Sequence, residues 1–546
     1  MMPGRNIAVL CALALAFSCS RDATAVYDDS RLDIAPFYGI VEYGGPFAGD
    51  AAADSVDMQD EDTFWEAVGF RDHVVVTWSA GGADVQGAPW VGRRMDGGDV
   101  VLDIGESKKT EIVLRGSSGD GSLKVYGAKK FKLTLSGLDL RSSTGAAVNI
   151  QCPKRVFVHL TDGTVNRLVD APSYVRREGE DMKACFFAEG DIIFSGTGAL
   201  LVEGTGGNAI ASDDGIVFRP GVTVVSVASS SAGKSVKAKE CIEMKGGLLD
   251  LSTSGDAYYD EASMDDKSSV CMSSDSTIFL RGGVLSASST GIAGKGIKAA
   301  GSIFIGEDGT AGPDITVSTS GGKFEGTGYS SSPKGIKALG RIEVRSGRVT
   351  IPSCAHEGME SKDPDVASIR ISGGELNLKS FDDCINTAGG VLIEGGNVFV
   401  CSTGNDGIDA NYHGEGSFDL EGGYVIALTS YVKHDAGVDT DKSPMKIAGG
   451  TLFTCGRPQR GITSAPNGKS ATQPVVMLEG IDLGENDLVE VSDGNGKTLF
   501  SFRMHFPFPE SNSLFTCPQF TLKGTYTIRY GSSEQSVTFT GNYIRQ

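Results

Sequence analysis

Seven of the aspartates between residues 382 and 441 have the side-chain chemistry of a calcium site. They are Asp382, Asp383, Asp406, Asp409, Asp435, Asp439 and Asp441. Ca²⁺ takes about six to eight oxygen ligands, and carboxylates supply them well. These residues therefore predict a calcium site, provided that the fold brings them onto adjacent strands. The alternative is a solvated acidic surface whose carboxylates pair with lysines of the neighbouring strand.

Three pairs of lysines occur earlier in the chain, each with two residues between its members. They are Lys234 and Lys237, Lys295 and Lys298, and Lys334 and Lys337. Ammonium groups spaced along a groove match a polysaccharide that carries one carboxylate per sugar. The alternative is that these lysines are merely solvated and screened by salt. Tyr258 and Tyr259 are candidates either for stacking on sugar rings or for pinning a long loop.

A repeated five-residue phrase shows how these groups are positioned. It reads Lys-Gly-Ile-Lys-Ala at 295–299 and 334–338, Asp-Cys-Ile-Asn-Thr at 383–387, and Asp-Gly-Ile-Asp-Ala at 406–410. An internal repeat of about 25 residues is typical of stacked structural units. With looser copies included, the central apolar residue of the phrase recurs at Phe186, Ile210, Val236, Met272, Ile297, Ile336, Met359, Ile385, Ile408 and Val438.

Alternating apolar and polar residues follow each phrase and are interrupted by paired glycines, as in 242–251 and 391–400. Alternation predicts strands, and the glycines permit a corner with positive φ between them. A unit of two or three short strands cannot bury its own apolar face, so it must stack on its neighbours. The sequence therefore predicts an all-β fold, a parallel β-helix, in which equivalent residues of successive coils lie about 4.8 Å apart.

The residue just before the central apolar position of the phrase is small in every copy. Cys185, Cys271 and Cys384 occupy this place in three copies, where other copies have glycine, alanine or serine. The pattern favours packing of these thiols inside the core over a functional role. With no metal-like spacing between the cysteines and the six histidines, zinc is not indicated.

The composition restricts the possible partners. The formal net charge of −20 and the absence of basic runs exclude nucleic acid as an expected partner. Glycine is abundant with 75 residues, but 18 prolines without a collagen period exclude a collagen triple helix. Cations and neutral or polyhydroxy ligands fit this composition better.

The segments outside the repeat predict the remaining organisation of the chain. An apolar run makes 1–18 a predicted signal peptide, and the small residue before Cys19 is similar to a bacterial lipobox, which predicts lipidation of Cys19. Membrane contact is expected only through this anchor, on an outer-membrane or cell-surface lipoprotein; plain secretion is the alternative. The expected units are an acidic tether at 19–62, an N-terminal β cap at 63–104, the β-helix at 105–465 and an antiparallel C-terminal β unit at 466–546.

Several phrases between about residues 105 and 465 resemble the carbohydrate-binding β-helix family of exported bacterial proteins. They include 121–126, 129–135, 154–158, 181–183 and the repeated Gly-Ile-Lys-Ala units. The resemblance implies a right-handed parallel β-helix like that of pectate lyases, calcium held by acidic residues on the coils, and binding of acidic plant polysaccharide such as polygalacturonate, without established catalysis. The family's Asp-Gly-Ile phrase is kept at 406–408 and partly at 383–385, whereas three units carry lysine.

Three functional hypotheses follow from these features. The first is a noncatalytic, monomeric protein that binds an acidic polysaccharide with calcium on its coils. The second is a polysaccharide lyase, because a calcium-bridged uronate beside a lysine able to remove the C5 proton suffices for β-elimination. The third is a structural scaffold or adhesin whose charges serve solubility.

Overall fold

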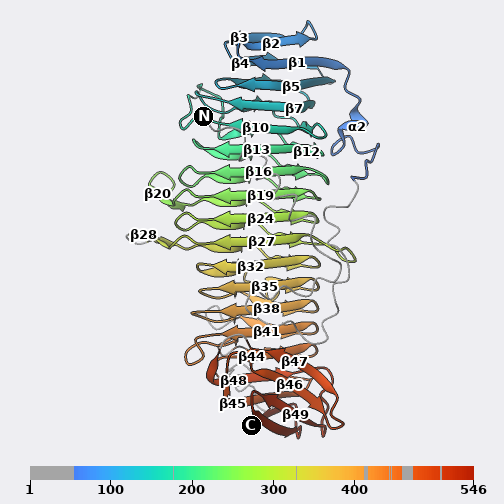
Figure 1. Cartoon of the computed structure of the whole chain (residues 1–546), viewed down its shortest axis with the longest axis vertical. Helices are drawn as coiled ribbons and strands as arrows, with labels where there is room; N and C mark the ends of the chain where they lie inside the picture. The colour runs from blue at the N-terminus through green and yellow to red at the C-terminus, as the bar shows by residue number, and fades with distance from the viewer. Residues whose placement is uncertain are drawn as a thin grey trace.

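The computed structural model describes residues 54–546 except 108, 176, 327–328, 411–415, 442, 444, 458–470 and 505–506. The predicted signal peptide, Cys19 and most of the predicted tether lie outside the described residues. In the described part, short strands wind into an elongated solenoid whose coils stack along the longest axis (Figure 1). No helix in this part is long and apolar enough to cross a bilayer.

Strands at equivalent places in successive coils pair in parallel and form three columns. The first column contains β4 (Asp99–Asp103), β6 (Ser122–Tyr126), β8 (Val148–Gln151), β11 (Ala184–Ala188), β14 (Asn208–Ser212), β17 (Lys234–Ala238), β22 (Val270–Ser274), β25 (Lys295–Ala299), β30 (Lys334–Ala338), β33 (Glu357–Ser361), β36 (Ile385–Thr387), β39 (Ile408–Asp409) and β42 (Val438–Asp439). The second contains β9 (Val156–Leu160), β12 (Ile192–Gly196), β15 (Ile216–Phe218), β18 (Ile242–Met244), β23 (Ile278–Leu280), β26 (Ile303–Ile305), β31 (Ile342–Val344), β34 (Ile369–Ile371), β37 (Gly390–Ile393), β40 (Ser417–Leu420) and β43 (Met445–Ile447).

The third column follows the second along each coil. It contains β10 (Val165–Val169), β13 (Ala199–Gly204), β16 (Thr223–Ala228), β19 (Leu248–Thr253), β24 (Val284–Ser289), β27 (Asp314–Thr319), β32 (Arg348–Cys354), β35 (Glu375–Ser380), β38 (Asn397–Ser402), β41 (Tyr424–Thr429) and β44 (Thr451–Cys455). The predicted all-β, parallel β-helix architecture is therefore confirmed.

The repeat sets the register of the first column. Ile297 pairs with Ile336, and Ile385 pairs with Ile408. The remaining central apolar residues of the phrase continue the same ladder without a break from Phe186 to Val438. All ten side chains are buried in one core that runs the length of the solenoid. Because one buried apolar residue per coil is aligned in this way, all the remaining residues of each strand are aligned with their counterparts in the neighbouring coils.

Two other features of the phrase and its flanks have the expected geometry. The second glycine of each pair has a positive φ, as at Gly247 with 85° and Gly396 with 80°, and a Cβ on Gly247 would lie 2.6 Å from the Val222 carbonyl oxygen. Cys185 and Cys271 are buried in the core, and burial raises the pKa of the Cys271 thiol to about 12. These thiols pack as small core residues.

Hairpins close the N-terminal end of the solenoid. The strands are β1 (Asp72–Ser79), β2 (Gly82–Gly87), β3 (Gly92–Asp96), β5 (Thr110–Ser118) and β7 (Phe131–Arg141). The first strand pairs antiparallel with β2 and parallel with β5, and β3 pairs antiparallel with β4. Parallel stacking thus already begins at β1 and β4, and the hairpins cover the end of the core, which hides its strand edges.

A short segment that includes α2 (Trp65–Val68) crosses the outside of the first coils (Figure 1). The Arg219 guanidinium is 1% exposed and anchors this segment. Its nitrogens lie 3.0 Å from Glu66 Oε2 and 2.9 Å from Asp54 Oδ2, and its centre lies 4.4 Å from the Phe64 ring. Residues 54–66 are therefore fixed to the solenoid.

The C-terminal end is closed by strands that are mainly antiparallel; the exception is the last strand of the chain, which runs parallel to the first strand of this set. They are β45 (Val475–Leu483), β46 (Leu488–Asp493), β47 (Thr498–Arg503), β48 (Phe508–Thr516), β49 (Thr525–Tyr530), β50 (Ser533–Thr538) and β51 (Tyr543–Arg545). The last coil strand, β44, pairs antiparallel with β48, and β47, β46, β49 and β50 form a separate four-stranded sheet. A second core, rich in phenylalanine, lies between this sheet and the last coils.

Candidate functional site

The outward face of the first column, here called the first-column face, gathers most of the charged residues singled out in the sequence. Neighbouring residues of a strand point to opposite faces, so the residue after each buried apolar position points outward. From β17 to β42 this outward ladder reads Lys237, Ser273, Lys298, Lys337, Glu360, Asn386, Asp409 and Asp439. The sign of its charge changes between Lys337 and Glu360.

Three aspartates at the acidic end converge on one point. Asp383, Asp406 and Asp409 each offer a carboxylate oxygen, and the three oxygens lie within 4.8 Å of one another. Asp383 and Asp406 are 2% and 5% exposed, and Asp409 is half-buried. We call these residues the acidic trio. Asn386 Nδ2 donates to Asp383 Oδ2 at 2.8 Å and to Asp409 Oδ2 at 3.3 Å.

The electrostatics of the acidic trio favour protonation. Burial, followed by the charge of Asp409, raises the pKa of Asp383 to about 9. Burial and the nearby Asp439 raise the pKa of Asp406 to about 8, although the Ala436 N–H donates to its Oδ1 at 2.5 Å. In the described part of the chain no lysine, arginine or histidine nitrogen lies within 4.0 Å of either carboxylate. Such a cluster is an acidic site that could hold a metal ion.

The other four predicted metal ligands have different surroundings. Asp382 accepts from Asn405 Nδ2 at 2.6 Å, and its Oδ2 lies 2.8 Å from His356 Nδ1. Asp439 forms an ion pair with Arg457 and accepts from the Asp441 N–H at 2.8 Å. Asp435 is half-buried, and burial raises its pKa. The structure thus brings three of the seven predicted aspartates into one ligand set.

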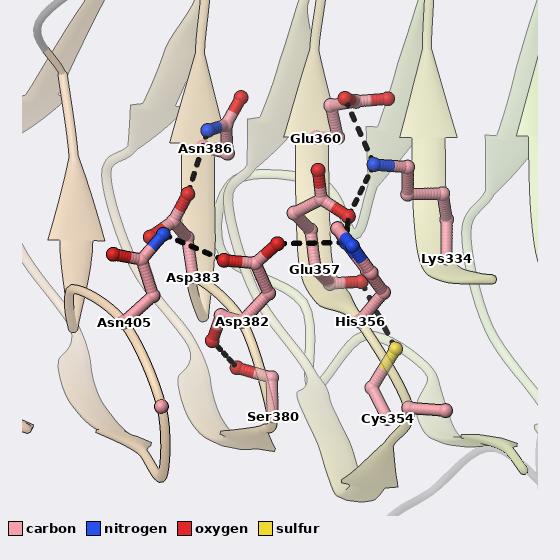
Figure 2. A network of polar contacts seen from close by, with 12 residues as sticks. Lys334, Cys354, His356, Glu357, Glu360, Ser380, Asp382, Asp383, Asn386 and Asn405 are labelled. Carbon is pink, nitrogen blue, oxygen red and sulfur yellow. Dashed lines mark hydrogen bonds and ion pairs between the residues drawn. The ribbon is translucent and has the colours of Figure 1, made fainter. Parts of the chain in front are cut away.

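A second polar network lies where the charge of the face changes sign (Figure 2). His356 Nδ1 lies 2.8 Å from Asp382 Oδ2 and also contacts Glu357, which is in turn paired with Lys334. Burial disfavours the imidazolium, but the hydrogen bonds to Asp382 and Glu357 outweigh it and raise the pKa of His356. These carboxylates are therefore neutralised by side chains of the chain itself.

Carboxylates of the chain also neutralise three of the predicted lysines. Lys334 Nζ lies 3.1 Å from Glu360 Oε1, and Lys337 Nζ lies 2.7 Å from Glu360 Oε2. Lys237 forms an ion pair with Asp275. The sequence left open the alternative that the aspartates pair with lysines of the neighbouring coil. In the structure it is a glutamate, Glu360, that forms such pairs.

The remaining three predicted lysines have lowered pKa values. Burial and then Lys298 lower the pKa of Lys295 to about 7, and burial and then Lys237 lower that of Lys234 to about 8. The buried Lys295 Nζ donates to Ser268 Oγ, the Ala293 carbonyl and Ser331 Oγ at 2.8, 2.9 and 3.1 Å. It is covered by the bases of two hairpins, so it is not accessible to a polymer.

Lys298 differs from the other lysines of the ladder. It is half-buried on the first-column face, and burial followed by the charge of Lys337 lowers its pKa. No carboxylate oxygen of the described residues lies within 4.0 Å of its Nζ. Lys298 is therefore the member of the lysine set that is best placed to accept an external anion.

Two hairpins protrude beside Lys295 and Lys298. They are β20 (Tyr258–Asp260) with β21 (Asp265–Lys267), and β28 (Phe324–Gly326) with β29 (Tyr329–Ser331). Tyr258 is 45% exposed at the start of β20, whereas Tyr259 is half-buried. Both predicted tyrosines thus belong to a hairpin that stands beside the face rather than on it.

Comparison with known proteins identifies the family. A family described as carbohydrate-binding domain-containing proteins matches residues 98–384, more than half of the 546 residues. The chain belongs to this family. The match includes the lysines of the first-column face and the His356 network, and it ends just after Asp383 of the acidic trio.

Two known proteins are similar to this chain. A carbohydrate-binding domain-containing protein of Acetivibrio thermocellus is 30% identical over 110 residues, which are 19% of this chain and 38% of that protein. This chain therefore spans well under half the length of that relative. A solved polysaccharide lyase-like protein from C. thermocellum is 14% identical, with a TM-score of 0.27, over 71% of this chain and 95% of that one.

In this member of the carbohydrate-binding domain-containing family, the sequence analysis did not single out two exposed aromatic residues near the acidic trio. Phe381 is 63% exposed and immediately precedes Asp382 and Asp383, and Tyr431 is 50% exposed and stacks on His434 at 4.5 Å. They lie on one line of turns, two coils apart, or about 10 Å. The sequence does contain one indication of Phe381, because it directly precedes the acidic phrase at 382–383, which the repeat aligns with the other coils.

Proposed function

We propose that this protein binds an acidic polysaccharide along the first-column face, with Ca²⁺ at the acidic trio, and does not cleave it. The family supports carbohydrate binding. The observation that carries the proposal is the convergence of three carboxylates, two of them buried and without a cationic partner among the described residues.

Calcium fits the acidic trio by donor type and by charge. Asp383, Asp406 and Asp409 supply hard oxygen ligands, and their mutual repulsion is relieved by a divalent cation. The trio provides only part of the coordination that Ca²⁺ takes, which is about six to eight oxygens. The remaining positions are open to water or to the carboxylate and hydroxyl oxygens of a sugar.

The geometry of the ladder suggests the direction of the bound polymer relative to the solenoid axis. Lys298 and Asp409 are separated by four coil steps, or about 19 Å along the solenoid axis. A polyuronate that runs parallel to this axis reaches both, with one carboxylate at Lys298 and another at the cation. The exposed ring of Phe381 borders the acidic trio and offers an apolar surface to a sugar ring.

Calorimetric titration with polygalacturonate tests this function. Binding is expected with Ca²⁺ and not with EGTA, and Asp406→Asn should abolish the calcium-dependent part. Asp250→Asn is the matched control, because Asp250 is half-buried in the third column, where burial alone raises its pKa. Equal binding with calcium and with EGTA would refute the calcium mechanism. An array of diverse glycans without any binding would favour the scaffold or adhesin alternative.

One observation favours polysaccharide lyase activity as a second candidate. The lowered pKa of Lys298 increases the fraction of neutral amine, which is the form that removes the C5 proton of a uronate. Chain cleavage would then eject the 4-linked oxygen and leave a double bond between C4 and C5. Ultraviolet absorbance of this unsaturated product, measured with polygalacturonate and Ca²⁺, separates the two candidates, and Lys298→Gln should remove any such activity.

We further propose that the protein acts outside the cytoplasm as a monomeric lipoprotein held by Cys19. The support is the apolar run and lipobox-like text of the N-terminal sequence. Fractionation of cells that express the native chain or Cys19→Ala tests this proposal. Release of the variant alone from the membrane fraction is expected, and membrane association of both would contradict it.

A further inference from the structure

We infer that the N-terminal end of the solenoid carries a second sugar site, which binds an uncharged pyranose without a metal ion. The site is an open hollow of about 620 Å³ beside β1, β3 and β4. Trp90, Asp72, Asp103, Glu106 and Ser107 line it. It lies in the N-terminal cap, at the opposite end of the first column from the acidic trio (Figure 1).

Trp90 is the tryptophan whose ring is available to a ligand. It lies in the link between β2 and β3 and is 46% exposed. The other two tryptophans have structural partners: Trp78 is 2% exposed with its Nε1 donating to the Gly98 carbonyl at 2.7 Å, and Lys132 Nζ lies 3.2 Å from the Trp65 ring centre. An indole half open to a hollow provides a flat apolar surface for the C–H face of a pyranose.

Two glycines line the same hollow as Trp90. Gly92 and Gly105 line the hollow without side chains, and nothing lies within 4 Å of the place where a Cβ on Gly105 would be. The φ of +51° at Gly105 also disfavours other residues there. Gly92 and Gly105 thus add no side chains to the hollow that Trp90 also lines.

Local hydrogen bonds hold the polar groups of the hollow in place. Asp103 Oδ1 accepts from the Gly105 N–H at 2.9 Å, and Ser107 Oγ accepts from Thr110 Oγ1 at 2.8 Å. A carboxylate oriented by its own backbone needs little reorganisation to accept a hydrogen bond from a sugar hydroxyl, and such charge-assisted bonds are strong. An aromatic surface beside fixed acceptors is suited to a ring with one apolar face and hydroxyls at its edge.

The charge of the hollow selects an uncharged sugar over a uronate. Asp72, Asp103 and Glu106 are all acidic, and Lys129 is paired with Glu106 at 3.1 Å. The carboxylate of a uronate would be repelled here, whereas hydroxyl donors are favoured. The hollow and the first-column face therefore differ in the ligand proposed for them and in their need for calcium. Experiments can contradict either proposal without contradicting the other.

Intrinsic tryptophan fluorescence tests the inference on the full chain. Cellohexaose, xylohexaose and mannohexaose are titrated separately in EGTA. At least one should give a saturable change in emission that is lost in Trp90→Phe, and Trp90→Ala should weaken its binding in calorimetry by about tenfold. Asp103→Asn should also weaken binding. Met95→Ala and Asp96→Asn, on the same β3–β4 hairpin, are the matched controls and should bind normally.

Three results would overturn the inference. They are no response to any of the three oligosaccharides, an equal response in Trp90→Phe, and unchanged affinity of Trp90→Ala in calorimetry. Circular dichroism establishes that the variants are folded. Calcium-dependent binding of polygalacturonate should be unchanged in Trp90→Ala. A result that contradicts the second sugar site can therefore be distinguished from one that contradicts the proposed function.

Discussion

Asp383 Oδ1 accepts a hydrogen bond from the backbone N–H of Asp406 at 3.1 Å, which ties the buried carboxylate of Asp383 to the backbone of the next coil. Neither carboxylate can move outward without losing a hydrogen bond from the backbone, given by the Asp406 N–H to Asp383 and by the Ala436 N–H to Asp406. The solenoid therefore holds two carboxylates, and Asp409 beside them, closer together than their charges favour. Because the fold holds these carboxylates in place before any ion binds, binding of a cation should have a large effect on the stability of the protein.

Calcium is expected to stabilise the folded protein. At a concentration about one-hundredfold above the dissociation constant, the ion should add about 2.7 kcal/mol to the free energy of unfolding. Thermal unfolding with Ca²⁺ and with EGTA measures this. The shift should disappear in Asp383→Asn and in Asp406→Asn but persist in Asp250→Asn. An unchanged melting temperature in the native chain would contradict the calcium site.

Stability without calcium should fall as the pH rises. Asp383 and Asp406 have folded-state pKa values of about 9 and about 8, above the ordinary value of 3.8. The folded protein therefore keeps protons that the unfolded chain has already released, and stability is lost from about the ordinary value upward through the folded pKa values. Urea unfolding over this pH range in EGTA measures the slope.

Two comparisons control this pH experiment. Asp383→Asn should have a shallower slope than the native chain, because one of the two titrations is removed. Saturating calcium should also flatten the slope, since the bound ion keeps both carboxylates ionised. A native slope that neither change affects would show that other groups determine the pH dependence.

The alignment of these residues could be predicted from the sequence, but their partners could not. One buried apolar residue per coil fixes the register, so the stacking of Ile297 on Ile336 and of Ile385 on Ile408 followed from spacing alone. The pairing of an outward side chain depends on rotamers and on the turn that precedes it. Asp382, one residue before Asp383, therefore faces His356 of the preceding coil.

Insertions explain why the environment of the lysines was not predictable. The hairpins at 258–267 and 324–331 interrupt the repeat, and sequence spacing gives no direction for them. In the structure, their bases supply Ser268 and Ser331, which bond to Lys295 Nζ and cover it. The lysine set that looks uniform in the sequence is thus divided into buried, paired and available members.

Removing Glu360 should destabilise the protein strongly. Its side chain is 3% exposed and pairs with Lys334, Lys337 and Lys362. Glu360→Gln leaves Lys337 without a carboxylate of the described residues and the buried Lys334 with Glu357 alone, and the expected loss is about 3–5 kcal/mol in urea unfolding. Glu394→Gln, which breaks a pair with the partly exposed Arg370, should cost less than about 1 kcal/mol. Similar losses in both variants would contradict the importance of burial.

Lys298→Gln should weaken polygalacturonate binding by about tenfold and reduce its dependence on salt. The reason is that Lys298 has no carboxylate of the described residues within ion-pair distance, so its charge is available to the polymer. Lys446→Gln is the control, because Lys446 is paired with Asp419 in the second column at 2.9 Å. Calorimetry at low and high salt measures both effects, and unchanged affinity of Lys298→Gln would remove this lysine from the site.

Phe381→Ala should separate sugar binding from calcium binding. The ring is 63% exposed and lies against Gly404, where a Cβ would be 3.4 Å from its edge, so its loss opens no core cavity. Calcium should stabilise this variant as it does the native chain, but polygalacturonate affinity should fall by about tenfold, since a stacking surface is lost. Val366→Ala, at a similarly exposed apolar residue, should change neither. If Phe381→Ala lost the calcium shift as well, the ring would act by supporting the acidic trio rather than by contacting sugar.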